Sequence, residues 1–306
     1  MIYFHSIQEG LPIFKALGSQ LRINIINILL RDESKSLNEI ATELNISNGA
    51  LSTHIKKLEE CGLISVSKEG AEGHGNIKIC KLLDNKMLVE FNRPCSLNNV
   101  LQTHIKVGHY REHEVYPTCG LASATSLIGE VDDNRFFDHP DRFDADILWF
   151  TKGYITYEIP NFVPPQQKID QISLSFEIGS EAPGFNDNWP SDIYFQLNGV
   201  PIGKWLSPGD FGSTKAFLSP SWWYNEWNQY GLLKLLVINQ KGTFIDGTKI
   251  SDTTLDQFNL QYKSRICITF SVPEDAEHVG GLTLYGKSFG NYRQDINVQI
   301  HYRSIE

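Results

Sequence analysis

Six side chains that could contact nucleic acid fall within ten residues of a predicted helix. They are Asn48, Ser52, Thr53, His54, Lys56 and Lys57. All can donate hydrogen bonds to phosphate oxygens or base edges. The other side of this helix carries Leu51, Ile55 and Leu58, at the spacing of a buried stripe. The pattern predicts one face packed on a core and one face free for a partner.

The segment just before this helix predicts how it is positioned. Ser36 and Glu39 form a capping box, which indicates a helix that runs to about Leu44. Ser47 caps the second helix, and Gly62 ends it. The spacing is that of a helix-turn-helix. The alternative is a helical hairpin with a solvated polar face, in which His54 is a partly buried packing residue.

Flanking segments complete a winged helix-turn-helix. Apolar residues from Ile13 to Ile28 predict one further helix upstream, with Pro12 near its first turn. Downstream, residues 63–68 and 77–82 predict two strands joined by a glycine-rich turn at 69–76.

The run from Ser47 to Ile64 matches S-x-x-x-L-S-x-H-[IL]-x-x-L-x-x-x-G-L-[IV], and residues 10–90 resemble the ArsR-type winged-helix regulators. The resemblance implies a homodimer that places one recognition helix per subunit in successive major grooves of a double-stranded DNA operator. It also implies a set of DNA-facing positions. These are Ser47, Asn48, Gly49, Ala50, Ser52, Thr53, His54 and Lys57.

We expect Asn48, Ser52 and Thr53 to contact base edges or nearby phosphates. Phosphate contacts are expected from basic residues of the helix and the wing. These are Lys56, Lys57, Lys68, His74 and Lys78. The metal-sensing members carry regulatory cysteines on the helix before the recognition helix, and residues 37–45 contain none. Because Cys61 and Cys80 fall at apolar positions, a thiolate metal sensor of the founding type is not expected.

Length and charge predict two domains, at residues 1–90 and 91–306. The first holds ten basic and eleven acidic residues and the second 17 and 25, which together give the net charge of −9. The acidic second domain is therefore not expected to bind nucleic acid. Five cysteines without a C-x-x-C pair fit a reduced, cytoplasmic protein, and neither a membrane span nor a secretion signal is expected.

The second domain shows a period of two. Alternating runs at 172–178, 266–272 and 296–302, with similar runs at 153–159, 192–197 and 232–238, predict eight to ten short strands separated by turns. The expected fold is thus α+β multidomain, with a winged helix-turn-helix and a C-terminal antiparallel β-sandwich, most plausibly jelly-roll-like. Residues 91–146 are expected to form a linker, a first strand at 99–107 and a long loop.

Tryptophans and polar side chains are dense in this domain. The candidate ligand-binding residues are Trp149, Trp189, Asp192, Trp205, Trp222, Trp223 and Trp227. Indole faces stack on sugar rings while carboxylates and amides bind hydroxyl groups, so a sugar or oligosaccharide is the expected ligand. The alternative is that these aromatics serve the core or a dimer interface.

Catalytic and metal sites are not favoured. His109, His113 and Cys119 cluster loosely in the sequence, but a zinc site needs four converging donors, and no pair of carboxylates stands out. The sequence therefore predicts a non-enzymatic, DNA-binding transcriptional regulator that responds to a small effector and needs no cofactor. The rivals are a regulator whose C-terminal domain only mediates assembly and, less favoured, a carbohydrate-active enzyme.

Overall fold

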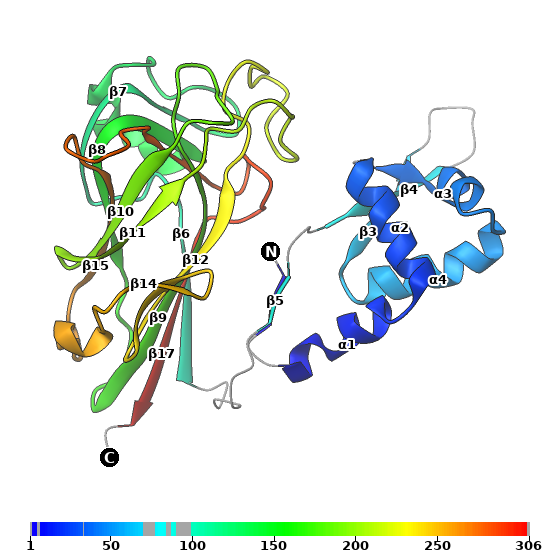
Figure 1. Ribbon diagram of the computed structural model, residues 1–306, viewed down its shortest axis with the longest axis horizontal. Helices are drawn as coiled ribbons and strands as arrows, with labels where there is room; N and C mark the ends of the chain where they lie inside the picture. The colour runs from blue at the N-terminus through cyan, green and yellow to red at the C-terminus, as the bar shows by residue number, and fades with distance from the viewer. Residues whose placement is uncertain are drawn as a thin grey trace. The chain divides into compact units, whose positions relative to one another are not determined.

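The computed structural model describes residues 2–4, 7–32, 34–69, 77–83, 87–89 and 99–304. The chain divides into two compact units, Met1–Ser96 and Leu97–Glu306, and each is described by itself (Figure 1). The division lies six residues beyond the boundary expected from the sequence.

In its described residues, the first unit contains four helices and a three-stranded antiparallel sheet of order β2-β4-β3. The helices are α1 (Ile7–Leu17), α2 (Gln20–Arg31), α3 (Leu37–Glu43) and α4 (Asn48–Glu60). The sheet strands are β2 (Lys35–Ser36), β3 (Ile64–Glu69) and β4 (Ile77–Leu82). Outside this sheet, β1 (Ile2–Phe4) pairs in parallel with β5 (Met87–Val89). The predicted winged helix-turn-helix is confirmed.

The prediction of a single upstream helix was wrong. The chain breaks at Gly18 and Ser19, where Ser19 is extended at φ −148°, and α1 and α2 meet at 92°. Pro12 lies inside α1 rather than in its first turn. The buried guanidinium of Arg22 donates to the carbonyls of Lys15 and Ala16, which satisfies the end of α1. Among the described helices, none alone has the length and apolar character to cross a bilayer, and α1 and α2 reach that threshold only as a bent pair.

The buried side of α4 anchors it in the core of the first unit. Leu51, Ile55 and Leu58 are at most 4 % exposed and belong to one apolar cluster with Ile25 of α2 and Ile40 of α3. The predicted stripe is therefore confirmed. With these three positions fixed inward, the other described positions of α4 are exposed, apart from the half-buried His54.

The second unit is built from twelve strands, all paired in antiparallel fashion. Their bounds are β6 (Val100–Ile105), β7 (Glu112–Ala122), β8 (Ile147–Ile159), β9 (Gln167–Gly179), β10 (Ser191–Leu197), β11 (Val200–Ser207), β12 (Leu232–Asn239), β13 (Gly242–Ile245), β14 (Thr248–Ser251), β15 (Ile266–Val272), β16 (Leu282–Tyr285) and β17 (Ile296–Ser304).

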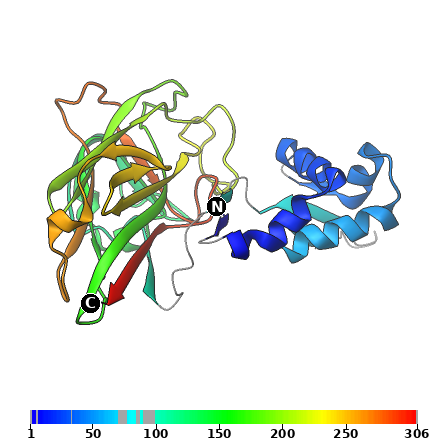
Figure 2. The same cartoon turned by 60° about the horizontal axis from the view of Figure 1, so that its bottom comes forward.

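The twelve strands form one continuously paired sheet that divides into two parts, called the two sheets below, joined along one seam. One sheet has the order β7-β8-β15-β10-β11, and the other has the order β6-β17-β9-β12-β13-β14. The short strand β16 pairs with β8 on one side and with β9 on the other, and so connects the two sheets. Figures 1 and 2 show both sheets curving around a common interior. The predicted antiparallel, sandwich-like domain is confirmed.

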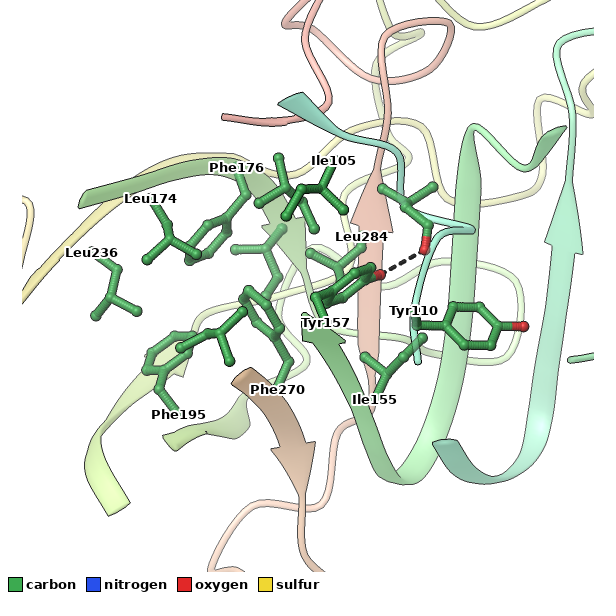
Figure 3. Packing of buried hydrophobic residues seen from close by; sticks show 14 of the residues in the cluster. Ile105, Tyr110, Ile155, Tyr157, Leu174, Phe176, Phe195, Leu236, Phe270 and Leu284 are labelled. Atoms are coloured by element: carbon green, nitrogen blue, oxygen red, sulfur yellow. Dashed lines mark hydrogen bonds between the residues drawn. The ribbon is translucent and has the colours of Figure 1, made fainter. Parts of the chain in front are cut away.

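Aromatic side chains from both sheets fill this interior (Figure 3). Phe176 of β9 meets Phe270 of β15 edge to face, with ring centroids 4.9 Å apart. Tyr157 of β8 is fully buried, and its hydroxyl donates a 2.6 Å hydrogen bond to the carbonyl of Val107. A buried phenol is tolerated here because its one polar atom is paired.

The prediction of a long loop before residue 147 was wrong in one respect. Residues 112–122 form the strand β7, and two short 3-10 helices, η2 (Asn134–Asp138) and η3 (Pro140–Asp144), follow it. A register shift between Tyr116 and Cys119 interrupts the alternation of inward and outward side chains along β7. The sequence of this strand therefore lacks the regular period of two that would have predicted it. The expected first strand is confirmed as β6.

Candidate nucleic-acid interface and ligand pocket

Hydrogen bonds at two helix starts fix the helix-turn-helix. The Ser36 hydroxyl accepts from the Glu39 amide, and a Glu39 carboxylate oxygen accepts from the Ser36 amide at 2.8 Å, which completes the capping box. These bonds lower the pKa of Glu39. The Ser47 hydroxyl accepts from the Ala50 amide at 3.2 Å and so caps α4. Ser47 therefore has a structural role as well as a place at the exposed start of α4.

The outer face of α4 is exposed along ten residues. Its exposed members are Asn48, Gly49, Ala50, Ser52, Thr53, Lys56 and Lys57. They form two columns at i, i+4 spacing, one through Asn48 and Ser52 and one through Gly49 and Thr53, each of which ends at a lysine. The sequence-predicted contact residues of α4, apart from His54, are thus exposed side by side.

Two of these side chains are already oriented by hydrogen bonds. Asn48 Nδ2 donates to Asn38 Oδ1 of α3 at 2.8 Å, and the Ser52 hydroxyl donates to the Asn48 carbonyl at 2.7 Å. Asn48 Oδ1 and the Ser52 oxygen stay available as acceptors, and Asn48 keeps a second amide hydrogen. The start of α4 therefore offers a fixed arrangement of donors and acceptors, which lowers the entropy cost of a contact.

Charge limits the candidate interface to the first part of α4. Lys56 and Lys57 are followed by exposed Glu59 and Glu60, and Lys56 Nζ lies 3.7 Å from Glu60 Oε1. An exposed pair at this distance is weak, so Lys56 can exchange it for a phosphate at little cost. The two carboxylates disfavour a phosphate beyond Lys57.

Gly49 lies at the exposed start of α4 without any packing reason for its identity. A Cβ built on Gly49 would meet no atom within 4 Å. Glycine inside a helix costs about 0.5–1 kcal/mol relative to alanine. Its presence here leaves the backbone of α4 open to close approach by a partner.

His54 and the wing complete the predicted contact set. His54 is half-buried, and its Nδ1 is shielded from solvent without a hydrogen-bond partner among the described residues. In the wing, Lys68 pairs in register with Lys78, whose side chain is exposed. His74 and the side chain of Lys68 lie outside the described residues.

Comparison with known proteins identifies this part of the chain. Residues 19–66 match the family described as "Bacterial regulatory protein, arsR family". An uncharacterized protein of Methanocaldococcus jannaschii, MJ0432, is 34% identical over 77 residues, which cover 25% of this chain and 82% of that protein. The N-terminal unit belongs to the ArsR family.

Two solved structures are similar to the ArsR-type unit. One is reduced HlyU from Vibrio cholerae N16961, with 28% identity, a TM-score of 0.22 and coverage of 24% of this chain and 73% of that one. The other is a transcriptional regulator homologue from Pyrococcus horikoshii OT3, with 23% identity, a TM-score of 0.20 and coverage of 24% and 76%.

The cysteines of the ArsR-type unit that the structure describes are packed as apolar residues. Cys80 is fully buried, and burial raises the pKa of its thiol to about 11. Cys61 is half-buried at the end of α4, where burial likewise raises its pKa. Burial therefore favours the protonated form of both thiols.

In the second unit, three of the predicted ligand residues line one cavity. Trp149 of β8 and Trp223 and Trp227 of the 221–230 loop surround a space of about 150 Å³. Trp223 lies between the other two rings, with centroid distances of 5.8 Å to Trp149 and 4.7 Å to Trp227, and both pairs are nearly perpendicular. The three rings thus form a corner of indole surfaces.

The remaining predicted ligand residues lie elsewhere. Trp222 contacts Trp223 at 5.5 Å but is not among the cavity-lining residues, and its Nε1 donates to the carbonyl of Ala124. Trp189 is exposed, and Trp205 packs against the main core beneath the ammonium group of Lys234. Asp192 is buried and bound to Lys204 at 2.9 Å. The sequence-predicted set is therefore not one site.

Polar groups that sequence reasoning missed complete the cavity. Glu181 is 7% exposed, and its carboxylate accepts from the Thr118 hydroxyl at 3.2 Å and from Asn228 Nδ2 at 3.1 Å. Both partners also line the cavity. Thr283 of β16 donates to Glu181 Oε2 at 3.1 Å from the seam between the sheets. No local pattern in the sequence marks Glu181, because it follows β9 within a run of small and polar residues.

Burial disfavours negative charge on this carboxylate. It raises the pKa of Glu181 well above its ordinary range, and the nearby carboxylate of Asp210 raises it further. Asp210 is itself fully buried, and its Oδ1 has no hydrogen-bond partner among the described residues. The pKa of Asp210 is likewise raised by burial. Two buried acidic groups therefore share this region, and burial favours the neutral form of each.

The histidines considered as metal ligands do not converge on one point. His109 Nε2 lies 3.2 Å from the carbonyl of Phe143, and His113 Nε2 lies 3.1 Å from Asp138. In the described part of the chain, the group whose ligand atoms come within 4.8 Å of one another is Asp192, Glu277 and His278. Lys204 already neutralises Asp192 there, which disfavours a bound cation.

Proposed function

We propose that the protein is a DNA-binding transcriptional regulator in which α4 is the recognition helix. The observation that carries this proposal is the exposed row from Asn48 to Lys57 on a helix of ArsR type. Its polar start suits base edges, and its lysines suit phosphates. The open backbone at Gly49 and the amino end of α4 add N–H groups that favour a nearby phosphate.

The proposal predicts salt-sensitive binding to the DNA upstream of the protein's own coding region. Each lysine that neutralises a phosphate adds about 0.9 to the slope of log affinity against log salt. Lys57→Gln should therefore lower the slope by about 1. Lys215→Gln, an exposed lysine in the second unit, removes the same charge far along the chain and should leave the slope unchanged. Equal slopes for both variants, or no binding by the wild type, would overturn the proposal.

We further propose that the protein acts as a homodimer on a pseudo-palindromic operator. Ile7 and Leu11 of α1 are 47% and 36% exposed, and neighbouring exposed apolar side chains support a contact with a second copy. Sedimentation of the wild type and of Leu11→Glu tests this proposal. A monomeric wild type at the concentrations that saturate DNA would contradict it.

The second unit is proposed to bind the effector, for which the sequence favours a sugar. The indole corner and the buried carboxylate and amide beside it support a small-molecule site in this unit. Control of DNA binding requires that the effector prefer one of the DNA-competent and DNA-incompetent states. The test is DNA affinity measured with and without a ligand that raises the melting temperature.

The assembly-module alternative has less support. It requires Trp222, Trp223 and Trp227 to become buried only when two copies meet. Trp223 is already 3% exposed within one chain, and its Nε1 donates to the Asn228 carbonyl. Burial of this ring therefore needs no partner.

A further inference from the structure

The cavity beside Trp149 combines aromatic surfaces with a buried acid, and that combination indicates the charge of its ligand. We propose that it binds a small organic ammonium ion, with the three indoles around the cation and Glu181 as its counter-ion. The inference rests on the proposed effector site and changes its expected ligand from a neutral sugar to a cation.

The aromatic lining of the cavity favours a cation. Trp223 stands at 76° to Trp149 and at 79° to Trp227, so the cavity is bounded by indoles turned in different directions. The negative face of an indole attracts ammonium groups, and the gain rises when both partners are shielded from water. A cavity of about 150 Å³ admits a small ligand rather than a chain of sugar rings.

The groups around Glu181 do not balance a negative charge on it. Its polar partners, Thr118, Asn228 and Thr283, are all neutral. No basic residue is among the described residues that line the cavity, while Asp132 lines it as a second carboxylate. Of the other titratable groups near Glu181, Asp210 opposes a negative charge on it. The described residues around the cavity thus supply hydrogen-bond donors for Glu181 but no positive charge.

A neutral ligand would leave the carboxylate of Glu181 without a nearby positive charge. A cation would instead favour the ionised form of Glu181, because an opposite charge within a few ångströms stabilises the carboxylate. Binding should therefore release a proton from Glu181 whenever the free protein holds it protonated. This proton release distinguishes a cation from a sugar.

The experiment uses the full chain, a cation of fixed charge, and a pair of sugars that have the same shape but differ in charge. Binding is followed by tryptophan fluorescence and calorimetry with tetramethylammonium chloride, glucosamine and glucose, at an ionic strength held constant with potassium chloride. We expect tetramethylammonium and glucosamine to bind and glucose to fail. For tetramethylammonium, whose charge is fixed, affinity should rise with pH by up to about tenfold per unit. Calorimetry in two buffers of different ionisation enthalpy should detect the released proton.

Two variants and a control assign the site. Glu181→Gln preserves shape and the neutral state, so it should fold, yet lose at least about tenfold in cation affinity and all proton release. Trp227→Leu should weaken binding through the lost indole. Trp189→Phe, which alters an exposed ring outside the cavity, should bind as the wild type does.

Three results would overturn the inference. They are equal, pH-independent binding of glucose, binding of calcium chloride that excludes tetramethylammonium, and no binding of any of these probes. None of them bears on the salt-sensitive DNA binding of α4, so this inference and the regulator proposal fail separately.

Discussion

The indole of Trp149 lies across Gly120 of the neighbouring strand, so closely that a Cβ at Gly120 would come within 2.3 Å of the ring. The two residues are register partners in the pairing of β7 with β8. A side chain at position 120 would therefore displace a wall of the cavity. The position of the first indole is thus determined by the glycine opposite it.

Gly120→Ala should destabilise the second unit by about 1–3 kcal/mol, the usual cost of overpacking. Urea unfolding followed by tryptophan fluorescence measures this unit, because all six tryptophans lie in it. Gly179→Ala is the matched control, since its Cβ would meet its nearest neighbour at 3.6 Å. Equal losses in the two variants would show that Trp149 is not held by Gly120.

Gly49→Ala should raise the stability of the ArsR-type unit and weaken DNA binding. The added methyl group meets no atom within 4 Å in the free protein, so the expected gain is about 0.5–1 kcal/mol of helix stability. Helical circular dichroism in urea reports this gain, and a DNA titration at fixed salt reports the loss. Unchanged DNA affinity would mean that the backbone at Gly49 is not approached by DNA.

Ser36→Ala should cost the ArsR-type unit about 1 kcal/mol, because the start of α3 loses its cap. Ser36→Thr keeps a hydroxyl at this position and should lose less. Both are measured by the urea dependence of the helical circular dichroism signal. If the two variants were equally destabilised, the loss would come from packing around Ser36, which is itself buried, and not from the cap.

Asp210 should make the second unit less stable as the pH rises. Burial raises its pKa above the ordinary value of 3.8, so the folded state keeps a proton that the unfolded chain releases. Stability is therefore fully present below about pH 4 and is lost towards neutral pH, by up to about 1.4 kcal/mol per pH unit. Asp210→Asn keeps an acceptor for the Ala182 amide and should reduce this dependence, leaving the part that the raised pKa values of Glu177 and Glu181 contribute.

The control for this pH dependence is Asp252→Asn. Asp252 is exposed, and its hydrogen bond to Lys249 lowers its pKa, so it is ionised in both states above pH 5. Unfolding by urea at pH 5 and pH 8, followed by tryptophan fluorescence, compares the three proteins. A wild-type slope that persists in Asp210→Asn would assign it to another group.

The sequence predicted best what local chemistry determines. The Ser36–Glu39 box and the stripe at Leu51, Ile55 and Leu58 need only neighbouring residues, and both are present. Strand β15 has the predicted limits, and Asn198-Gly199 forms a tight hairpin with φ of 49° and 78°. The break at Gly18 and Ser19 was missed because the apolar spacing continues across it.

The cavity was predicted only in part because long-range contacts build it. Its tryptophans were visible as a cluster in the sequence, but Glu181 joins Asn228 and Thr283 across 47 and 102 residues. Glu177 falls at a polar position of the alternating run 172–178, yet it is fully buried and accepts from the backbone amides of Gly231, Asn291 and Tyr292. The alternation of residues along one strand does not show that a loop distant in the sequence will cover the polar face of that strand.

Strand β16 places the cavity at the seam where the two sheets meet. Thr283, which holds Glu181, has Trp149 of β8 and Gly179 of β9 as its two register partners. This one residue therefore touches the cavity wall, the acid and the edges of both sheets. A change in the protonation of Glu181 therefore changes a hydrogen bond at the residue that pairs with both sheets. A ligand bound at Glu181 would thus act on the strand that both sheets share.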